Sequence, residues 1–127
     1  MTDRPLVVVA DDDEDILLLV RATLSPTYDV AAARDGEQAL SLLQELRPAA
    51  AVLDIAMPGL DGLEVLTRVR ADPTLGALPV VLLSARAQEQ DVARGYALGA
   101  SRYIRKPFSP RELVAAVDEL VQPRDGV

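Results

Sequence analysis

Residues 51–62 read AVLDIAMPGLDG and end an apolar run on a single carboxylate, Asp54. A short, continuously apolar run bounded by turn-forming residues is typical of a strand buried on both faces of a parallel sheet. In such sheets, ligands bind beyond the carboxyl ends of the strands. An aspartate at this point is therefore a candidate site residue.

Similar strand patterns and helical patterns alternate along the rest of the chain. Runs at 6–10, 50–53 and 80–83 are continuously apolar, whereas 28–32 and 102–105 mix polar and apolar residues as edge strands do. Apolar residues recur at helical spacing at 16–23, 39–46, 62–69 and 113–121, and more weakly at 91–98, where Val92, Ala93, Tyr96 and Ala97 share one side.

This alternation predicts an α/β fold, the flavodoxin-like doubly wound (βα)5 arrangement with a five-stranded parallel sheet. If the three apolar runs are central and the two mixed runs are edges, the strand order is 2-1-3-4-5. No internal repeat or second domain is evident. We expect one domain at 1–121 and a C-terminal tail or the start of a linker at 122–127.

The composition excludes several kinds of chemistry. There is no cysteine and no histidine, so thiolate and imidazole ligands are not available. Twenty acids against 13 bases give a net charge of −7, which argues against direct nucleic-acid binding and favours a cation as partner. No apolar run approaches the roughly 20 residues of a membrane span, so we expect a cytoplasmic chain with no membrane contact.

Polar side chains follow four of the expected strands. Asp11 and Asp12 follow the first, Asp54 the third, Ser84 the fourth and Lys106 the fifth. With the order 2-1-3-4-5, the three carboxylates face one another across the crevice between strands 1 and 3, where they repel. A hard divalent cation such as Mg²⁺ suits these oxygen ligands, and Lys106, the sole lysine among 13 bases, adds a second positive charge.

Two chemical interpretations fit this group of side chains. It is either a binding site for a phosphate-bearing ligand or a carboxylate nucleophile that accepts a phosphoryl group. Neither GxxxxGK[ST] nor GxGxxG occurs. Nearby acids have simpler interpretations: Asp13, Glu14 and Asp15 as favourable charges in the first turn of a helix, and Asp61-Gly62 as a turn and helix start.

Four features of the chain carry a resemblance to a known family: the acidic pair after the first strand, the motif D-x-x-M-P-x-x-D-G that begins at Asp54, the hydroxyl of Ser84, and the motif K-P-F that begins at Lys106. In these features the chain resembles the receiver domain of the response regulators of two-component signalling, the chemotaxis regulators among them. The resemblance covers about residues 5–121. It implies a phosphoacceptor signalling module that takes a phosphoryl group from a histidine kinase or histidine phosphotransfer protein onto Asp54. It further implies that the chain is not an enzyme beyond its own phosphotransfer and slow autodephosphorylation, and that it switches conformation to control an output partner or domain.

The resemblance also assigns the metal ligands. It implies that Asp11 and Asp12 hold Mg²⁺, with Mn²⁺ as the alternative ion, together with Asp54 and the backbone carbonyl of Ala56. Ala56 and Arg86, two positions after Asp54 and the serine of the fourth strand, match positions that tune the lifetime of the phosphoryl group.

The switch residues follow from the same resemblance. It implies that Ser84 and Lys106 bond the phosphoryl group, and that a cis peptide joins Lys106 to Pro107. Tyr103 matches an aromatic residue whose ring moves inward on activation. The output surface is then the face of the fourth helix, fifth strand and fifth helix, which contacts a downstream protein.

One departure and several alternatives stay open. Many DNA-binding regulators carry an acidic pair before the aromatic of strand 5, used in a charged dimer face; Ser101-Arg102 stands here instead, so such a dimer is in doubt and a phosphorylation-dependent dimer is left open. The alternatives are a Mg²⁺-dependent phosphatase, disfavoured because Ala56 removes the second acid of D-x-D, a flavin-binding protein, and a receiver degenerated to binding alone.

Overall fold

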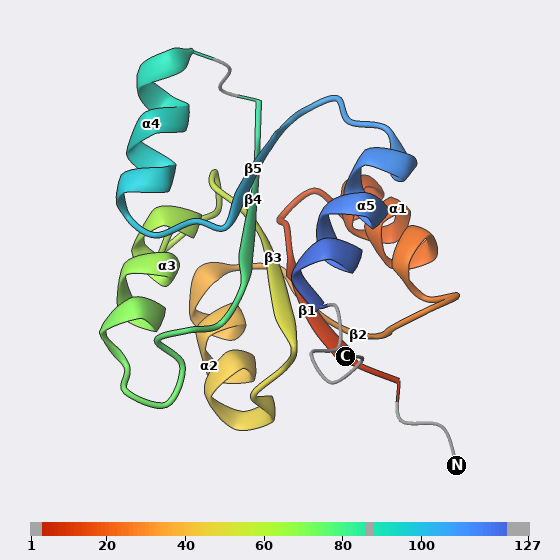
Figure 1. Ribbon diagram of the computed structural model, residues 1–127, viewed down its shortest axis with the longest axis horizontal. Coiled ribbons are helices and arrows are strands. Elements are labelled where there is room, and N and C mark those ends of the chain that lie inside the picture. The colour runs from red at the N-terminus through yellow and green to blue at the C-terminus, as the bar shows by residue number, and fades with distance from the viewer. Residues whose placement is uncertain (1–3, 86–87, 122–127) are drawn as a thin grey trace.

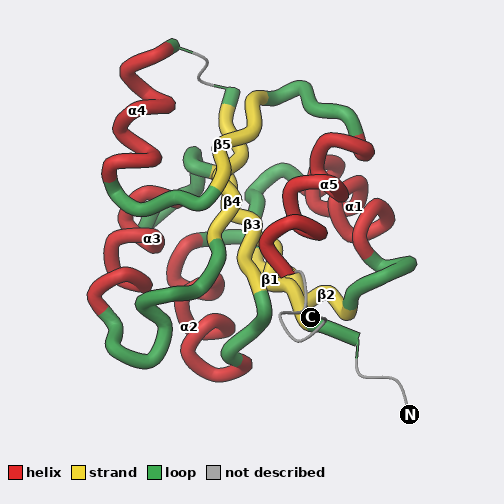
Figure 2. The backbone as a smooth tube through the Cα atoms, in the orientation of Figure 1, coloured by secondary structure: helices red, strands yellow, loops and turns green. Residues whose placement is uncertain are grey.

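The structure, a computed structural model, describes residues 4–85 and 88–121 and contains one sheet of five parallel strands in the order β2-β1-β3-β4-β5. The strands are β1 (Leu6–Ala10), β2 (Asp29–Ala33), β3 (Ala50–Asp54), β4 (Val80–Ser84) and β5 (Arg102–Arg105). The helices are α1 (Glu14–Leu24), α2 (Gly36–Leu46), α3 (Gly62–Ala71), α4 (Glu89–Ala97) and α5 (Pro110–Val121). The predicted fold class and strand order are confirmed (Figures 1 and 2).

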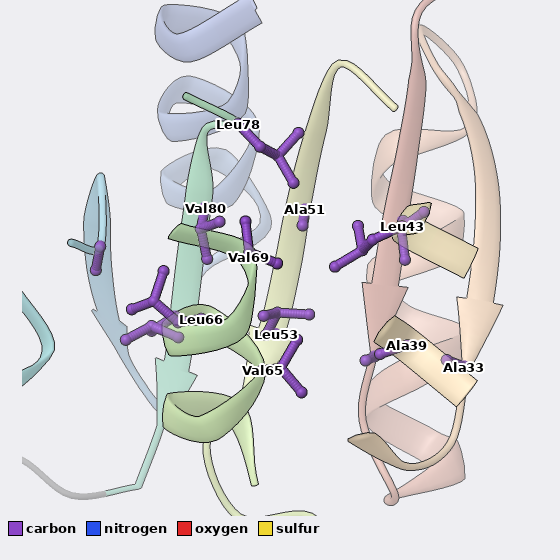
Figure 3. Packing of buried hydrophobic residues seen from close by; sticks show 14 of the residues in the cluster. Ala33, Ala39, Leu43, Ala51, Leu53, Val65, Leu66, Val69, Leu78 and Val80 are labelled. Atoms are coloured by element: carbon purple, nitrogen blue, oxygen red, sulfur yellow. The ribbon is translucent and has the colours of Figure 1, made fainter. Parts of the chain in front are cut away.

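Helices cover both faces of this sheet, α2, α3 and α4 on one side and α1 and α5 on the other (Figure 1). Successive side chains of a strand point to opposite faces, so Val8 joins the cluster under α2 and α3 while Val9 joins the cluster under α1 and α5. In Figure 3, Val65 and Val69 of α3 lie beside Leu53 of β3. Burying each such side chain contributes about 1.5–3 kcal/mol, which explains the continuously apolar central strands.

Strand boundaries differ slightly from the sequence prediction. Strand β2 begins at Asp29 rather than at residue 28, because the Tyr28 N–H donates to the Leu24 carbonyl (2.8 Å) and so closes the turn after α1. The hydroxyl of the buried Tyr28 donates to Asp118 of α5. Strands β3 and β4 each include one more residue than expected, Asp54 and Ser84, so both polar groups belong to the sheet itself.

The prediction of which side of the fourth helix is apolar and faces the sheet is wrong. Helix α4 has Gly95 as its buried residue, while Ala93 and Ala97 are exposed and Tyr96 keeps 43 % of its surface exposed. The physical reason is that α4 lies against Tyr103 of β5, whose bulky ring leaves no room for a side chain beneath the helix.

Helices α1 and α3 begin at acids for which the sequence analysis gave a structural role and not a chemical one. Asp13 accepts from the N–H groups of Asp15 and Ile16 and begins α1, and Asp61 forms a capping box with Glu64 to begin α3. The tail or linker expected at 122–127 and the position of Arg86 lie outside the described residues. Within the described ranges, none of the helices has the length and apolar character that crossing a membrane requires.

Candidate phosphoryl-acceptor site

The four strand-end groups of the sequence prediction lie at the carboxyl ends of neighbouring strands. Asp11 follows β1, Asp54 ends β3, Ser84 ends β4 and Lys106 follows β5. The chain order reverses between β1 and β3, and in open α/β sheets this switch point is where ligands bind. The fold thus brings together residues that are far apart in the sequence.

A buried group of ion pairs forms the centre of the site. The Lys106 ammonium stands 3.0 Å from Asp11 Oδ2 and 3.2 Å from Asp54 Oδ1. The side chains of Asp11 and Asp54 are almost fully buried, at 0 % and 5 % exposed, and that of Lys106 is 18 % exposed. Two buried carboxylates therefore share one ammonium, and when both are ionised the three groups together carry an excess of negative charge.

This arrangement shifts the protonation of both partners. Burial, followed by the negative charge of Asp11, raises the pKa of Asp54 to about 6, although Lys106 opposes the change. Burial by itself would lower the pKa of Lys106, but hydrogen bonds and attraction from Asp11 and Asp54 outweigh it and raise the pKa. Lys106 thus stays charged, while Asp54 holds a proton more tightly than an exposed aspartate does.

The acidic group also fits a hard cation. Asp11, Asp12 and Asp54 each offer one carboxylate oxygen, and these oxygens all lie within 4.8 Å of one another. Mg²⁺ binds oxygens at about 2.1 Å, so oxygens on opposite sides of one ion stand about 4.2 Å apart. Asp12 is exposed, which leaves the site open to water and to a phosphate oxygen, the other ligands that Mg²⁺ usually keeps.

Backbone contacts hold the two central acids in place. Asp11 Oδ1 accepts from the Asp13 N–H (2.9 Å), and the Gly62 N–H donates to the Ile55 carbonyl (2.9 Å). A Cβ at Gly62 would stand 2.4 Å from the Asp54 carbonyl oxygen, so only glycine lets the start of α3 approach this strand end. The sequence interpretation had Gly62 only as a helix start; glycine directly after a capping aspartate was the available hint.

The remaining predicted residues lie around this centre. Ser84 is buried, and its carbonyl accepts from the Lys106 N–H (2.8 Å). The peptide bond from Lys106 to Pro107 is cis. Tyr103 is half-buried on β5, and Ala56 is exposed in the loop after β3. The functional roles of Ser84, Tyr103 and the Ala56 carbonyl stay predictions.

One half-buried arginine was missed by sequence reasoning. The Arg70 guanidinium donates to the carbonyls of Gly99 (2.7 and 3.0 Å), Leu78 (2.7 Å) and Gly76 (3.1 Å), and burial lowers the pKa of Arg70. It thereby ties the end of α3 to the loops that precede β4 and β5. Nothing local distinguishes Arg70 from the other eleven arginines, because all three partners come from later turns of the chain.

A doubly wound sheet with an acid–lysine group at its switch point defines a class of signalling domain. The sequence profile of the response regulator receiver domain matches residues 7–118, and the chain belongs to this family. The chain is 38 % identical over 125 residues to the DNA-binding response regulator MtrA of Mycobacterium tuberculosis, covering 98 % of this chain and 54 % of that protein. It is 46 % identical over 121 residues to the transcriptional regulatory protein PrrA of Mycobacterium bovis, covering 94 % and 51 %.

Solved structures agree with this assignment. The Francisella response regulator 1452 receiver domain superposes with a TM-score of 0.88 at 33 % identity, covering 94 % of this chain and 98 % of that one. The chemotaxis response regulator CheY4 of Vibrio cholerae superposes with a TM-score of 0.87 at 28 % identity, covering 93 % and 99 %.

The length of the relatives limits what can be carried over. The chain spans about half the length of the curated relatives it matches. Since MtrA is named a DNA-binding regulator, the expectation that this chain contacts no nucleic acid is not confirmed. The chain is a receiver domain of a two-component response regulator, and its partners are matters for proposal.

Proposed function

We propose that Asp54 is the phosphoacceptor of this receiver domain and takes a phosphoryl group from a histidine kinase or a histidine phosphotransfer protein. The observation that carries the proposal is the Asp54 carboxylate at the end of β3, held 3.2 Å from the Lys106 ammonium and within 4.8 Å of the carboxylate oxygens of Asp11 and Asp12. The signalling unit is the segment 1–121, and the segment 122–127 is assigned as a tail or linker start.

The chemistry is a displacement at phosphorus. An Asp54 carboxylate oxygen bonds to phosphorus while the P–N bond to the donor histidine breaks. The ring nitrogen keeps the electron pair, and because the other ring nitrogen of the phosphohistidine carries a proton, the histidine leaves as a neutral imidazole and a mixed anhydride remains on Asp54. Lys106, 3.2 Å from Asp54 Oδ1, would pair with a phosphoryl oxygen. A Mg²⁺ ion held by Asp11, Asp12, Asp54 and the Ala56 carbonyl would supply further positive charge for the phosphoryl oxygens. Slow attack of water on the mixed anhydride reverses the modification.

The added charge is the proposed trigger of the switch. It offers the Ser84 hydroxyl and Lys106 a common partner and favours the state in which Tyr103 lies inward. The face of α4, β5 and α5 then contacts a downstream protein or domain. On this face an arginine, Arg102, stands where many DNA-binding relatives place an acid. Arg102 pairs with Glu119 of the same chain at 2.6 Å.

Labelling with a small acyl phosphate tests the proposal. In the presence of Mg²⁺, we expect acetyl phosphate to add one phosphoryl group, seen by mass spectrometry of the intact chain, and we expect Asp54→Asn to abolish this addition. The matched control is Asp61→Asn, which removes a carboxylate from a helix cap where asparagine caps equally well. Undiminished labelling of the Asp54 variant, with label found elsewhere, would refute the assignment.

The metal assignment has its own test. Mg²⁺ should raise the thermal unfolding midpoint of the unmodified chain, because an ion bound only by the folded state stabilises it. Asp12→Asn should weaken the Mg²⁺ affinity obtained from this titration about tenfold or more, since it replaces a negatively charged carboxylate ligand of the acidic group with a neutral amide. Asp15→Asn, an exposed acid of the first turn of α1, is the control. Equal responses of both variants would place the ion elsewhere.

A further inference from the structure

We infer that Gly95 is a positioning residue for Tyr103: the missing side chain forms a notch in α4 that admits the tyrosine ring and sets the balance between its inward and outward positions. The inference rests on the proposed function, in which the position of the Tyr103 ring follows the state of Asp54. It concerns a helix that the sequence pattern placed with the wrong side toward the sheet.

The geometry of the notch leaves no room for a methyl group. A Cβ at Gly95 would stand 2.9 Å from Cδ2 and 3.2 Å from Cε2 of the Tyr103 ring, and 3.2 Å from Cδ1 of Leu82. Carbon atoms in contact normally lie about 3.5–4.0 Å apart. Leu82 is fully buried in β4 and cannot retreat, whereas Tyr103 is half-buried on the edge strand and can. The ring is therefore the group that a side chain at position 95 would displace.

The backbone of Gly95 does not itself require glycine. Its φ does not fall in the left-handed region, which among the described glycines is occupied by Gly59 and Gly99. Glycine inside a helix lowers helix stability relative to alanine, and α4 has only nine residues and no side-chain cap at Gln88. The presence of Gly95 in the middle of this short helix is therefore explained by the space that the Tyr103 ring requires.

The neighbouring residue fixes the backbone of the same tyrosine. The Tyr103 N–H donates to the hydroxyl of Tyr96 at 3.1 Å, so consecutive residues of α4 contact the main chain and the ring of Tyr103. With its amide held in this way, Tyr103 can move mainly by rotation of its side chain. Gly95 provides the space that the ring occupies in this structure, which we assign as the inward end of that rotation.

Filling the notch should separate phosphorylation from the response to it. Gly95 lies on α4 and belongs to none of the pairs around Asp54, so uptake of the phosphoryl group at Asp54 should continue in Gly95→Ala. The ring, however, would meet the added methyl group in its inward position. The variant should therefore accept the phosphoryl group and still leave Tyr103 outward.

The experiment uses the full chain labelled with 3-fluorotyrosine and followed by fluorine NMR. The chain has three tyrosines, and Tyr103→Phe identifies the signal of interest. Because overpacking of this kind is strongly unfavourable, we expect Gly95→Ala to lower the inward-to-outward ratio of the Tyr103 ring about tenfold or more, with or without acetyl phosphate and Mg²⁺. The matched control is Gly76→Ala, where an added Cβ would meet its nearest atoms at 3.4 and 3.5 Å.

A second variant keeps the inference testable if Gly95→Ala folds poorly. In Gly95→Ala combined with Tyr103→Ala the ring is gone and only the contact with Leu82 is left, so the methyl group should lower the unfolding midpoint relative to Tyr103→Ala by much less than Gly95→Ala lowers it relative to the unmodified chain. A Tyr103 signal in Gly95→Ala identical to that of the unmodified chain would overturn the inference. So would a double variant whose unfolding midpoint lies as far below that of Tyr103→Ala as the midpoint of Gly95→Ala lies below that of the unmodified chain. If the ring shifts but Asp54 takes no label, the notch stands and the proposed function fails; if labelling succeeds and the ring does not move, the notch fails alone.

Discussion

Lys106→Met should lower the free energy of unfolding at pH 7.5, in the absence of divalent cations, by about 2–4 kcal/mol. The loss of stability comes from the two acids with which Lys106 forms ion pairs. Without the ammonium, the carboxylates of Asp11 and Asp54 remain buried and unneutralised, and leaving a charge unpaired in the interior costs far more than an exposed pair contributes. Chemical denaturation followed by circular dichroism measures the change.

The comparison variant is Arg102→Met, which breaks the pair with Glu119 on the surface. Both side chains of that pair are more than two-fifths exposed, at 44 % and 64 %, so the expected loss is below about 1 kcal/mol. Mg²⁺ should stabilise Lys106→Met more than it stabilises the unmodified chain, because the ion restores positive charge between the acids. Similar losses in both variants, or a Lys106 variant indifferent to Mg²⁺, would show that this ammonium does not balance the site.

The fold could be predicted because its causes are local or periodic. The runs LVVVA, AAVL and VVLL are apolar on both faces, and only a sheet covered by helices on both sides accommodates three such strands. The start of α5 has a local cause of the same kind, because the Ser109 side chain accepts from the Glu112 N–H at 3.1 Å and Pro110 is the first helical residue. The strand order 2-1-3-4-5 was predicted from these runs together with the resemblance to receiver domains.

The candidate site was predictable in membership but not in pairing. A parallel sheet places every strand end on one edge, so Asp11, Asp54, Ser84 and Lys106 had to lie near one another once the order was known. The sequence could not show that Lys106 contacts both acids, or that Asp11 is buried while its neighbour Asp12 is exposed. Those details depend on rotamers and on the approach of α1 and α3.

Contacts between elements distant in sequence account for the remaining misses. Gly95 disrupts the apolar stripe of α4, so a periodicity test places the wrong side of the helix against the sheet; only the position of Tyr103 explains the residue. Arg70 is equally invisible, because its partners are backbone carbonyls that any sequence would supply. Glycine and arginine act here through geometry that no local pattern encodes.

Asp54→Asn should stabilise the folded chain at neutral pH, even though it removes one partner of an ion pair. Burial and the charge of Asp11 raise the pKa of Asp54 from its ordinary 3.8 to about 6, so the folded chain binds this proton more tightly than the unfolded chain does. The stability that this proton contributes is full below about pH 4 and is lost as the pH rises through about 6. Asparagine cannot ionise and escapes that loss.

The sign of the difference can therefore be followed with pH. Without Mg²⁺, the unfolding free energy of Asp54→Asn minus that of the unmodified chain should grow between pH 4 and pH 7 and level off at about 1–3 kcal/mol. Adding Mg²⁺ should shrink the difference, because the ion stabilises the ionised carboxylate of the unmodified chain. Asp61→Asn leaves the buried acids untouched and should show no such rise. A difference that falls with pH would mean that Lys106 more than neutralises Asp54, and that the excess negative charge assigned to this site is absent.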